Sequence, residues 1–305
     1  MRPGLFTDGL AHLPLSQAVA WCAARGIVDL ELGVGGYSPA PHLVDGAAET
    51  IAGGGCRIAA LNASGNPLHP DPDVARDHDG ALRTAVALAA RLGVDRVVAM
   101  SGCPGSGARP VFAGGAWLPD MEGLWQQQWV AIAEYWRELS GWAADEAPGV
   151  RICLELHPGT SIYNPASFAL LRALVGDNIG VNLDPSHFWW QGIDPVAAIG
   201  ALGASIGFAH GKDTLLHPGL IATNGVFDFA WPEREPENLP WHFSAVGGGH
   251  PLAEWERLLG ALRAAGYDGV VSIEHEDPLL TPEEGIETSL DALLEVIGVR
   301  VGTAW

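Results

Sequence analysis

Short apolar runs alternate with longer segments of helical periodicity along the whole chain. Eight runs rich in aliphatic residues predict buried strands, and they begin near residues 4, 27, 57, 95, 151, 178, 205 and 269. Before the fifth run, residues 121–146 place apolar side chains three or four positions apart, at Trp125, Trp129, Ile132, Trp136, Leu139 and Ala143. That spacing predicts an amphipathic helix, which Pro148-Gly149 ends. Strands that alternate with helices eight times predict an α/β protein whose parallel sheet closes into a (β/α)8 TIM barrel.

No linker or change of composition divides the chain, so we expect one domain over residues 1–305. A doubly wound sheet is the alternative fold, but no GxGxxG pattern follows the first strand. Two segments are longer than ordinary connections, residues 101–120 after the fourth strand and residues 213–250 after the seventh. In a barrel both lie at the carboxyl-terminal mouth, where barrel enzymes bind their substrates. We expect them to be loops that shape a site.

The composition restricts the cellular compartment and the binding partners that we expect for this protein. Of the 305 residues 48% are hydrophobic, which is enough for a large core. No apolar run reaches the roughly 18 residues of a membrane span, and the first residues lack the uninterrupted apolar stretch of a secretory signal. The cysteines, at positions 22, 56, 103 and 153, lie far apart, which favours free thiols in a cytoplasmic protein. With 16 basic against 36 acidic residues, the formal charge of −20 would repel nucleic acids and anionic membranes.

Polar residues gather at the ends of the last four predicted strands. Side chains two positions apart in a strand face the same side. The apolar set must face the helices, so the polar set points into the barrel. The four runs offer Glu155 and His157 in RICLELHP, Asn182 and Asp184 in VNLDPSH, His210 and Lys212 in GFAHGKD, and Ser272, Glu274 and Glu276 in VVSIEHE. One residue of metal-ligand type from each run therefore meets at the mouth: Glu155, Asp184, His210 and Glu274.

This convergence of acids predicts a metal ion. Three carboxylates without a cation would repel one another strongly in a low dielectric. Three oxygen ligands and one imidazole suit Mn²⁺, with Mg²⁺, Co²⁺ or Zn²⁺ as alternatives. A single strand-end acid is more often a capped loop residue or an ion-pair partner. Four such residues on consecutive strands of one barrel instead predict one bound divalent ion.

Two further residues near the mouth are candidates for catalysis. His187 lies on the loop three positions after Asp184 and is a candidate for binding or protonating a substrate oxygen, with helix capping or support of a ligand as the alternative. Lys212 is a candidate for polarising a substrate oxygen. Its alternative is a structural ion pair with Asp213 or Glu274.

Other residues are candidates for contacts with the substrate. Each has packing, turn formation or support of a metal ligand as its structural alternative, and they are Asn62, Asn66, His69, His157, Trp189, Trp190, Trp231 and Trp241. Glu31 ends the second strand and is a candidate for orienting a ligand, or for a structural ion pair. His275 is expected to point away from Glu274, toward the helices.

Four motifs resemble the metal motifs of the xylose isomerase-like TIM barrels. They are ELHP, NLDPSH, AHGKD and SIEHED, and the resemblance extends over nearly the whole chain. The family includes sugar epimerases, inosose dehydratases and proteins of the sugar phosphate isomerase/epimerase kind. The resemblance implies a metal held by Glu155, Asp184, His210 and Glu274, the same set that the strand ends indicate. It also implies that Glu155 and Glu274 move protons and that His187 contacts the substrate.

The arrangement predicts a divalent-metal-dependent isomerase or epimerase of a sugar or keto sugar. A metal that chelates the carbonyl and hydroxyl oxygens acidifies the carbon between them and stabilises the enediolate, while two carboxylates remove and return the proton. The alternative on the same barrel is a keto-sugar lyase or dehydratase, either inosose dehydratase-like or a 3-keto-glycoside lyase, which begins with the same proton abstraction. A remote alternative is an apurinic-site endonuclease. The acidic charge and a fourth strand that ends in Met100-Ser101-Gly102, without an extra histidine, disfavour it.

The expected partner is a small-molecule sugar, with no nucleic acid and no membrane, and the sequence leaves a homo-oligomer open. Few cations lie near the predicted mouth, namely Arg109, Lys212 and Arg234, which favours an unphosphorylated substrate. An intact ligand set argues against a sugar-binding barrel without catalysis.

Overall fold

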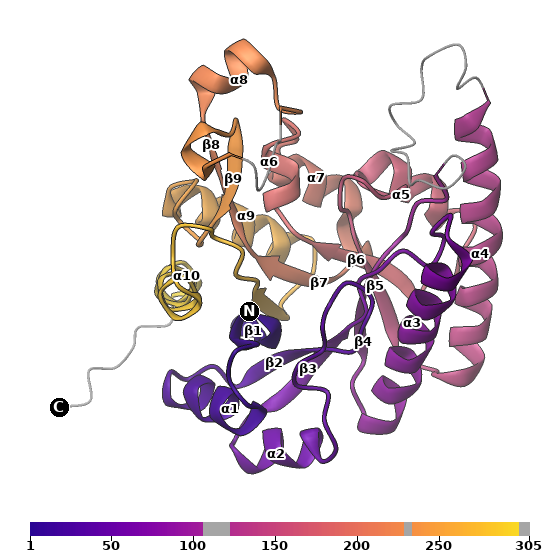
Figure 1. The fold of residues 1–305 in the computed structure, drawn as a ribbon, viewed down its shortest axis with the longest axis horizontal. Helices are drawn as coiled ribbons and strands as arrows, with labels where there is room; N and C mark the ends of the chain where they lie inside the picture. Colours follow the sequence, from indigo (N-terminus) through magenta and orange to yellow (C-terminus); the bar gives the residue numbers. More distant parts are fainter. Residues whose placement is uncertain (106–122, 229–233, 299–305) are drawn as a thin grey trace.

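Eight parallel strands close into a barrel, as the alternating pattern predicts (Figure 1). The computed structural model describes residues 1–105, 123–228 and 234–298, and these form a single TIM-barrel domain. Strands adjacent in the chain are adjacent in the barrel, and the last strand closes the ring against the first. The barrel strands are β1 (Arg2–Phe6), β2 (Asp29–Gly33), β3 (Arg57–Asn62), β4 (Arg96–Met100), β5 (Arg151–Glu155), β6 (Ile179–Leu183), β7 (Ile206–Gly211) and β10 (Val270–Ile273).

Alternation along the strands produces two apolar layers. Outward-facing residues such as Val97, Ile152 and Val181 are fully buried in the main core between strands and helices. Inward-facing residues form a separate small cluster inside the barrel: Ala60, Val98, Cys153, Phe208 and Val270. This cluster fills the middle of the barrel, so polar side chains occupy its two ends.

A ring of helices covers the outside of the barrel (Figure 1). They are α1 (Leu15–Ala24), α2 (Ala47–Gly53), α3 (Pro72–Leu92), α4 (Leu124–Glu146), α5 (Pro165–Arg172), α7 (Pro195–Leu202), α9 (Leu252–Ala264) and α10 (Pro282–Ile297). In α4 the predicted apolar stripe is buried at Ile132, Trp136 and Leu139. The first residue of the stripe, Trp125, is instead 41% exposed and stacks on Trp129.

Residues 213–250, which we expected to form a loop, contain an antiparallel hairpin and a helix. β8 (Asp213–Leu216) pairs with β9 (Trp241–Ser244), and α8 (Pro218–Asn224) lies between them in the chain. Figure 1 shows these elements in orange, beside the short helix α6 (Ser186–Trp189). The expectation was wrong because four-residue strands are too short to show a clear two-residue period.

Asp213 fastens the hairpin to the barrel. Its carboxylate is fully buried and accepts hydrogen bonds from the backbone N–H groups of Gly247 and His250, at 3.0 Å each. The indole of Trp255, in α9, donates to the same carboxylate at 2.9 Å. Gly249 lies so close to β8 that an added Cβ would come within 2.1 Å of the Thr214 carbonyl oxygen. The hairpin is therefore an anchored part of the barrel.

Three further expectations concern the chain as a whole. Of the predicted loop at residues 101–120, only 101–105 are among the described residues. All four cysteines are buried and none forms a disulfide bond, as their spacing predicts. In the part of the chain that the structure describes, no helix is both long and apolar enough to cross a membrane.

Candidate active site

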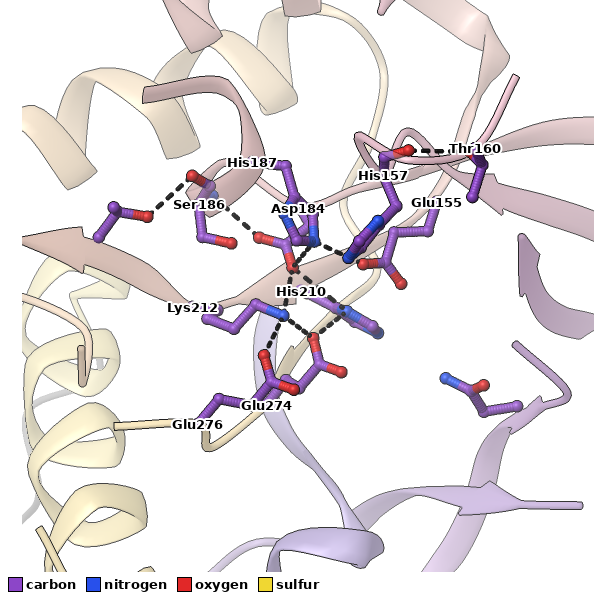
Figure 2. Close-up of polar contacts among 12 residues, drawn as sticks. Glu155, His157, Thr160, Asp184, Ser186, His187, His210, Lys212, Glu274 and Glu276 are labelled. Carbon is purple, nitrogen blue, oxygen red and sulfur yellow. Dashed lines mark hydrogen bonds and ion pairs between the residues drawn. The ribbon is translucent and has the colours of Figure 1, made fainter. Parts of the chain in front are cut away.

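Neighbouring strands bring four side chains of metal-ligand type together at the carboxyl-terminal mouth (Figure 2). Glu155 is the last residue of β5, Asp184 directly follows β6, His210 lies near the end of β7, and Glu274 directly follows β10. One ligand atom of each side chain lies within 4.8 Å of the others. They meet because β5, β6, β7 and β10 are consecutive in the barrel and parallel. These are the four residues that the strand ends predict.

The cluster is enclosed, and its surroundings separate the pKa values of its acids. Glu155 and Asp184 are each 2% exposed. Burial raises the pKa of Glu155 to about 7, and the nearby Glu274 carboxylate adds to the rise. Burial also acts to raise the pKa of Glu274, but Lys212 and His210 outweigh it and bring the value to about 2. Lys212 likewise outweighs burial at Asp184 and holds its pKa well below the usual range. Two acids are therefore anions, while Glu155 exchanges a proton near neutral pH.

A buried acid on β2 holds the ring of His210. The Nε2 of His210 lies 3.1 Å from Oε2 of Glu31, and Asn62 donates to Oε1 of the same carboxylate at 2.7 Å. A carboxylate only accepts, so the His210 Nε2 carries a proton. Burial lowers the pKa of His210, but Glu31 and Glu274 outweigh it and raise the value well above normal. The sequence left open whether Glu31 orients a ligand or forms an ion pair, and the structure places its carboxylate against the ring of His210, where it does both.

The donor set fits a divalent cation. The Nδ1 of His210 and the Oδ2 of Asp184 are enclosed and lie 3.8 Å apart. Nδ1 also lies 3.0 Å from Oε2 of Glu274, and Oδ2 lies 3.1 Å from the Nζ of Lys212. Carboxylate oxygens and an imidazole nitrogen are ligands that divalent cations accept. The arrangement is therefore suited to one ion held by Glu155, Asp184, His210 and Glu274.

Helix α6 positions His187, which we had expected on a loop. Its Nε2 lies 2.8 Å from Oε1 of Glu155 and 3.5 Å from Oδ2 of Asp184. The ring of His157 packs against it, with ring centroids 4.3 Å apart (Figure 2). Burial lowers the pKa of both imidazoles to about 4, so both rings are neutral at pH 7. The chain turns directly from β6 into α6, and the first turn of this helix brings His187 back over the cluster.

Lys212 lies among the acids, as Figure 2 shows. Its Nζ donates to Glu274 at 2.6 Å and to Glu276 at 3.0 Å, and it lies 3.1 Å from Oδ2 of Asp184. Burial lowers the pKa of Lys212, but the acids outweigh it and hold the value well above normal, so Lys212 is an ammonium ion. Of the two ion-pair partners considered from the sequence, Glu274 is the partner and Asp213 binds elsewhere. Glu276 was assigned no role, although its position two residues after Glu274 places it on the same face.

The hairpin contributes a wall to this site. The ring of Phe243, in β9, lies edge-on to His187 with centroids 5.5 Å apart. The Nζ of Lys212 lies 4.7 Å from the centroid of the Phe243 ring. The Thr214 hydroxyl, in β8, donates to the Ser186 carbonyl oxygen in α6 at 2.8 Å. Phe243 was not singled out from the sequence, since no local pattern distinguishes a phenylalanine in a hairpin from one in a core.

A cavity of about 320 Å³ lies beside the cluster, on the side of β1 and β2. Glu155 and Glu274 line it, together with Asn62 and Asp8. Asp8 follows β1 and accepts a hydrogen bond from the Ser38 hydroxyl, while burial raises the pKa of its carboxyl group. It was not predicted, although an acid close to the end of an apolar run is the signal that singled out Asp184, and only Thr7 separates Asp8 from β1. No lysine or arginine is among the described residues that line this cavity.

Two residues that we expected to contact the substrate, Asn66 and His69, instead form hydrogen bonds within the segment that connects β3 to α3. The Nδ1 of His69 accepts a hydrogen bond from the Asp71 backbone N–H at 3.0 Å. The side-chain oxygen of Asn66 accepts from the Leu68 backbone N–H, also at 3.0 Å. Both contacts are turn interactions, and neither residue lines the cavity beside the cluster.

The predicted tryptophan contacts lie along the hairpin side of the mouth. Trp189 is 9% exposed and stacks on His250 with centroids 4.0 Å apart. Trp190 stacks on Trp241 at 4.6 Å. None of these three tryptophans lines the 320 Å³ cavity. Two residues named from the sequence fall outside the described residues: Arg109 and Trp231.

Comparison with known proteins relates this geometry to one family. The family model for the xylose isomerase-like TIM barrel matches residues 19–296. The uncharacterized protein YfiH of Bacillus subtilis (strain 168) is 36% identical, over 97% of this chain and 99% of its own. An inosose isomerase of Halalkalibacterium halodurans is 29% identical over 49% of each chain. The crystal structure of the IOLI protein with a binding zinc atom shares the fold, with a TM-score of 0.68 and 20% identity over 98% of both chains.

Proposed function

Because this chain belongs to the xylose isomerase-like TIM barrel family, we propose that it is a divalent-metal-dependent isomerase or epimerase of a sugar or keto sugar. The observation that carries the proposal is the enclosed ring of Glu155, Asp184, His210 and Glu274, which borders a cavity of about 320 Å³. We propose Mn²⁺ as the ion because three of the four donors are carboxylates. The zinc atom of the IOLI structure supports Zn²⁺ as the alternative. When bound, a divalent ion would polarise a substrate carbonyl and so acidify the adjacent carbon.

The two glutamates would move the proton at that carbon. Lys212 and His210 keep Glu274 ionised, so its carboxylate is available as a base. Glu155 is bonded to the neutral His187, and its pKa of about 7 allows it to hold or release a proton at neutral pH. Two carboxyl groups with different proton affinities are what removal and return of one proton require.

The surrounding residues would orient the substrate and exclude water. Lys212 and His187 carry N–H groups beside the glutamates and would donate to substrate oxygens. Phe243 covers both of them from the hairpin side and limits the access of water. Asn62 lines the cavity and stays a candidate for substrate contact. His157, by contrast, supports the ring of His187.

The cavity favours a neutral polyhydroxylated substrate. Its described lining carries carboxylates, hydroxyls and the amide of Asn62, without lysine or arginine. Lys212 is held by three carboxylates, and Arg234 is paired with Asp228 at 2.7 Å. A phosphate group would meet repulsion here. The name of the inosose isomerase relative also supports a ring ketone with several hydroxyls as the substrate class. Four buried cysteines without a disulfide bond are in keeping with a cytoplasmic enzyme.

Exchange of hydrogen with solvent tests the proposal. The metal-replete protein is incubated in D₂O with a panel of keto sugars and inososes, and deuterium is located by NMR. We expect incorporation only next to the carbonyl, and its loss in Glu155→Gln and Glu274→Gln, because an amide cannot take up the proton. Glu254→Gln on the surface of α9 is the matched control and should exchange like the wild type. Absence of exchange with every ketone would overturn the proposal.

The product decides between the proposed reaction and its nearest alternative. A keto-sugar lyase or dehydratase would begin with the same exchange. The Lys212 ammonium, placed beside Glu274 at 2.6 Å, would be suited to protonating a leaving hydroxyl or alkoxide. Recovery of an isomeric sugar would support the isomerase or epimerase. An unsaturated product or a released aglycone would instead assign the lyase.

A further inference from the structure

Four of the eight barrel strands begin with arginine. Arg2, Arg57, Arg96 and Arg151 are the first residues of β1, β3, β4 and β5. Because all barrel strands are parallel, these residues lie at the end of the barrel opposite the carboxylate cluster. They represent four of only 16 basic residues in a chain with a net charge of −20. Such a concentration of positive charge requires compensating anions nearby.

Two of these arginines share one carboxylate. The Nε of Arg2 lies 2.7 Å from Oδ2 of Asp29, and the Nε of Arg57 lies 2.8 Å from Oδ1 of the same side chain. Asp29, the first residue of β2, is 1% exposed. This group of three residues therefore keeps one net positive charge.

Buried carboxylates do not neutralise the positive charges of the other two arginines, Arg96 and Arg151. Arg96 donates to the Gly207 carbonyl oxygen at 2.8 Å and pairs with Asp95, whose side chain is 68% exposed. Arg151 donates to the Ala204 carbonyl oxygen at 3.1 Å. Within the described ranges no carboxylate lies at ion-pair distance from Arg151, and its enclosed Nε has no acceptor. Burial lowers the pKa of Arg151, and the charge of the neighbouring Arg96 lowers it further.

These side chains surround a second cavity, which we call the amino-terminal cavity. Its volume is about 400 Å³, and its lining includes Arg2, Arg96 and Arg151. Phe208 and Val270, from the apolar cluster inside the barrel, also line it. The volume lies in the range of sites that hold small metabolites and exceeds what a bare ion needs.

Two aspartates on the rim do not cancel this charge. Asp95 and Asp268 also line the cavity, and their side chains are 68% and 75% exposed. Asp95 is already paired with Arg96, and Asp268 with the amino group of Met1. Screening by solvent weakens exposed carboxylates relative to half-buried guanidinium groups. The interior of the cavity is therefore left positive.

We propose that the amino-terminal cavity binds a small phosphate monoester. The phosphate would take the place of the missing carboxylate at Arg151 and bridge it to Arg96, since planar guanidinium groups bind phosphate oxygens in pairs. The organic part would lie against Phe208 and Val270. The site is separate from the mouth of the barrel, and its existence does not depend on the reaction proposed there.

Calorimetric titration with glycerol 3-phosphate and with inorganic phosphate tests this site. We expect saturable binding of the ester to the wild type, and binding about tenfold weaker or more in Arg151→Gln, because a charge-assisted bidentate contact is lost. Arg257→Gln, an exposed arginine paired with Glu254, is the matched control and should bind like the wild type. Arg96→Gln replaces Arg151→Gln if circular dichroism shows that the latter does not fold.

The Asp184→Asn variant distinguishes phosphate binding in the amino-terminal cavity from phosphate binding at the metal cluster. A phosphate bound through a metal at the mouth would be lost in Asp184→Asn and kept in Arg151→Gln, and that result would overturn the proposal. Loss in Arg151→Gln together with retention in Asp184→Asn supports it. Absence of saturable binding to the wild type overturns it entirely. Equal affinity for inorganic phosphate and for the ester would overturn the assignment of a monoester.

Discussion

Replacing Glu31 by glutamine tests whether the orientation of His210 controls metal binding. Glu31 is 1% exposed, and its carboxylate accepts from His210 at 3.1 Å and from Asn62 at 2.7 Å. Glutamine has the same shape but offers one acceptor oxygen and one donating amide. If the oxygen keeps the bond from Asn62, the amide faces the His210 Nε2 and favours the tautomer with its proton on Nδ1. That tautomer cannot offer Nδ1 to a cation.

The size of the effect follows from this loss of support. Removing the group that orients a ligating histidine typically weakens metal binding about 10–100-fold. In free energy this corresponds to about 1.4–2.7 kcal/mol. We expect the upper half of the range for Glu31→Gln, because one amide oxygen cannot satisfy both enclosed donors. The protein should remain folded, since the substitution preserves volume.

Competition with a fluorescent chelator measures the dissociation constants for Mn²⁺ and Zn²⁺. Asp29→Asn is the matched control because Asp29 is a buried acid on the same strand and is bonded to Arg2 and Arg57 at the opposite end. This control should lower the midpoint of thermal unfolding and leave metal affinity unchanged. An unchanged dissociation constant in Glu31→Gln would refute the reasoning about His210. A weakening of equal size in Asp29→Asn would refute it as well.

Three further predictions address the cluster and the hairpin. Elemental analysis of protein purified without chelator should find one divalent ion per chain, and Asp184→Ala should lose it; retention at the wild-type level would contradict the ligand assignment. Asp213→Ala should lower the free energy of unfolding by about 3 kcal/mol or more, since it leaves several buried donors unpaired, and a loss below about 1 kcal/mol in urea denaturation would count against this anchor. Phe243→Ala should keep the metal but slow turnover about tenfold, or roughly 1.4 kcal/mol of barrier, because it uncovers Lys212 and His187. Unchanged kinetics on the substrate that the exchange assay identifies would exclude the hairpin from the site.

Local patterns predict much of the barrel and of the cluster. The two-residue period of each strand decides which side chains face inward, and so places Glu155 and Asp184 on the inner side. The same period turns His275 away from Glu274. Its ring packs so closely on Gly285, in α10, that an added Cβ would lie 2.2 Å from it, which confirms the expected direction.

Local patterns do not predict contacts between residues that are far apart in the sequence. Glu31 and His210 are 179 positions apart, and no feature near either one identifies the other as its partner. The hairpin of β8 and β9 is too short for its period to be recognised, so Phe243 had no predicted place. The arginines that begin four strands are visible in the chain, but the register of β4 on β5 places Arg96 beside Arg151, and closure of the barrel brings Arg2 to the same cavity.

The sequence by itself determined the class of the fold and the donors at the mouth, because strand period and strand order are local properties that a parallel barrel repeats at each step. Only the tertiary structure decided which side chains around the cluster pair with one another. Lys212 pairs with Glu274 rather than Asp213, His187 turns back over Glu155 from a helix, and Glu31 orients His210. These pairings depend on distances across the barrel, which closure of the sheet fixes to a few ångströms and which spacing along the chain does not encode.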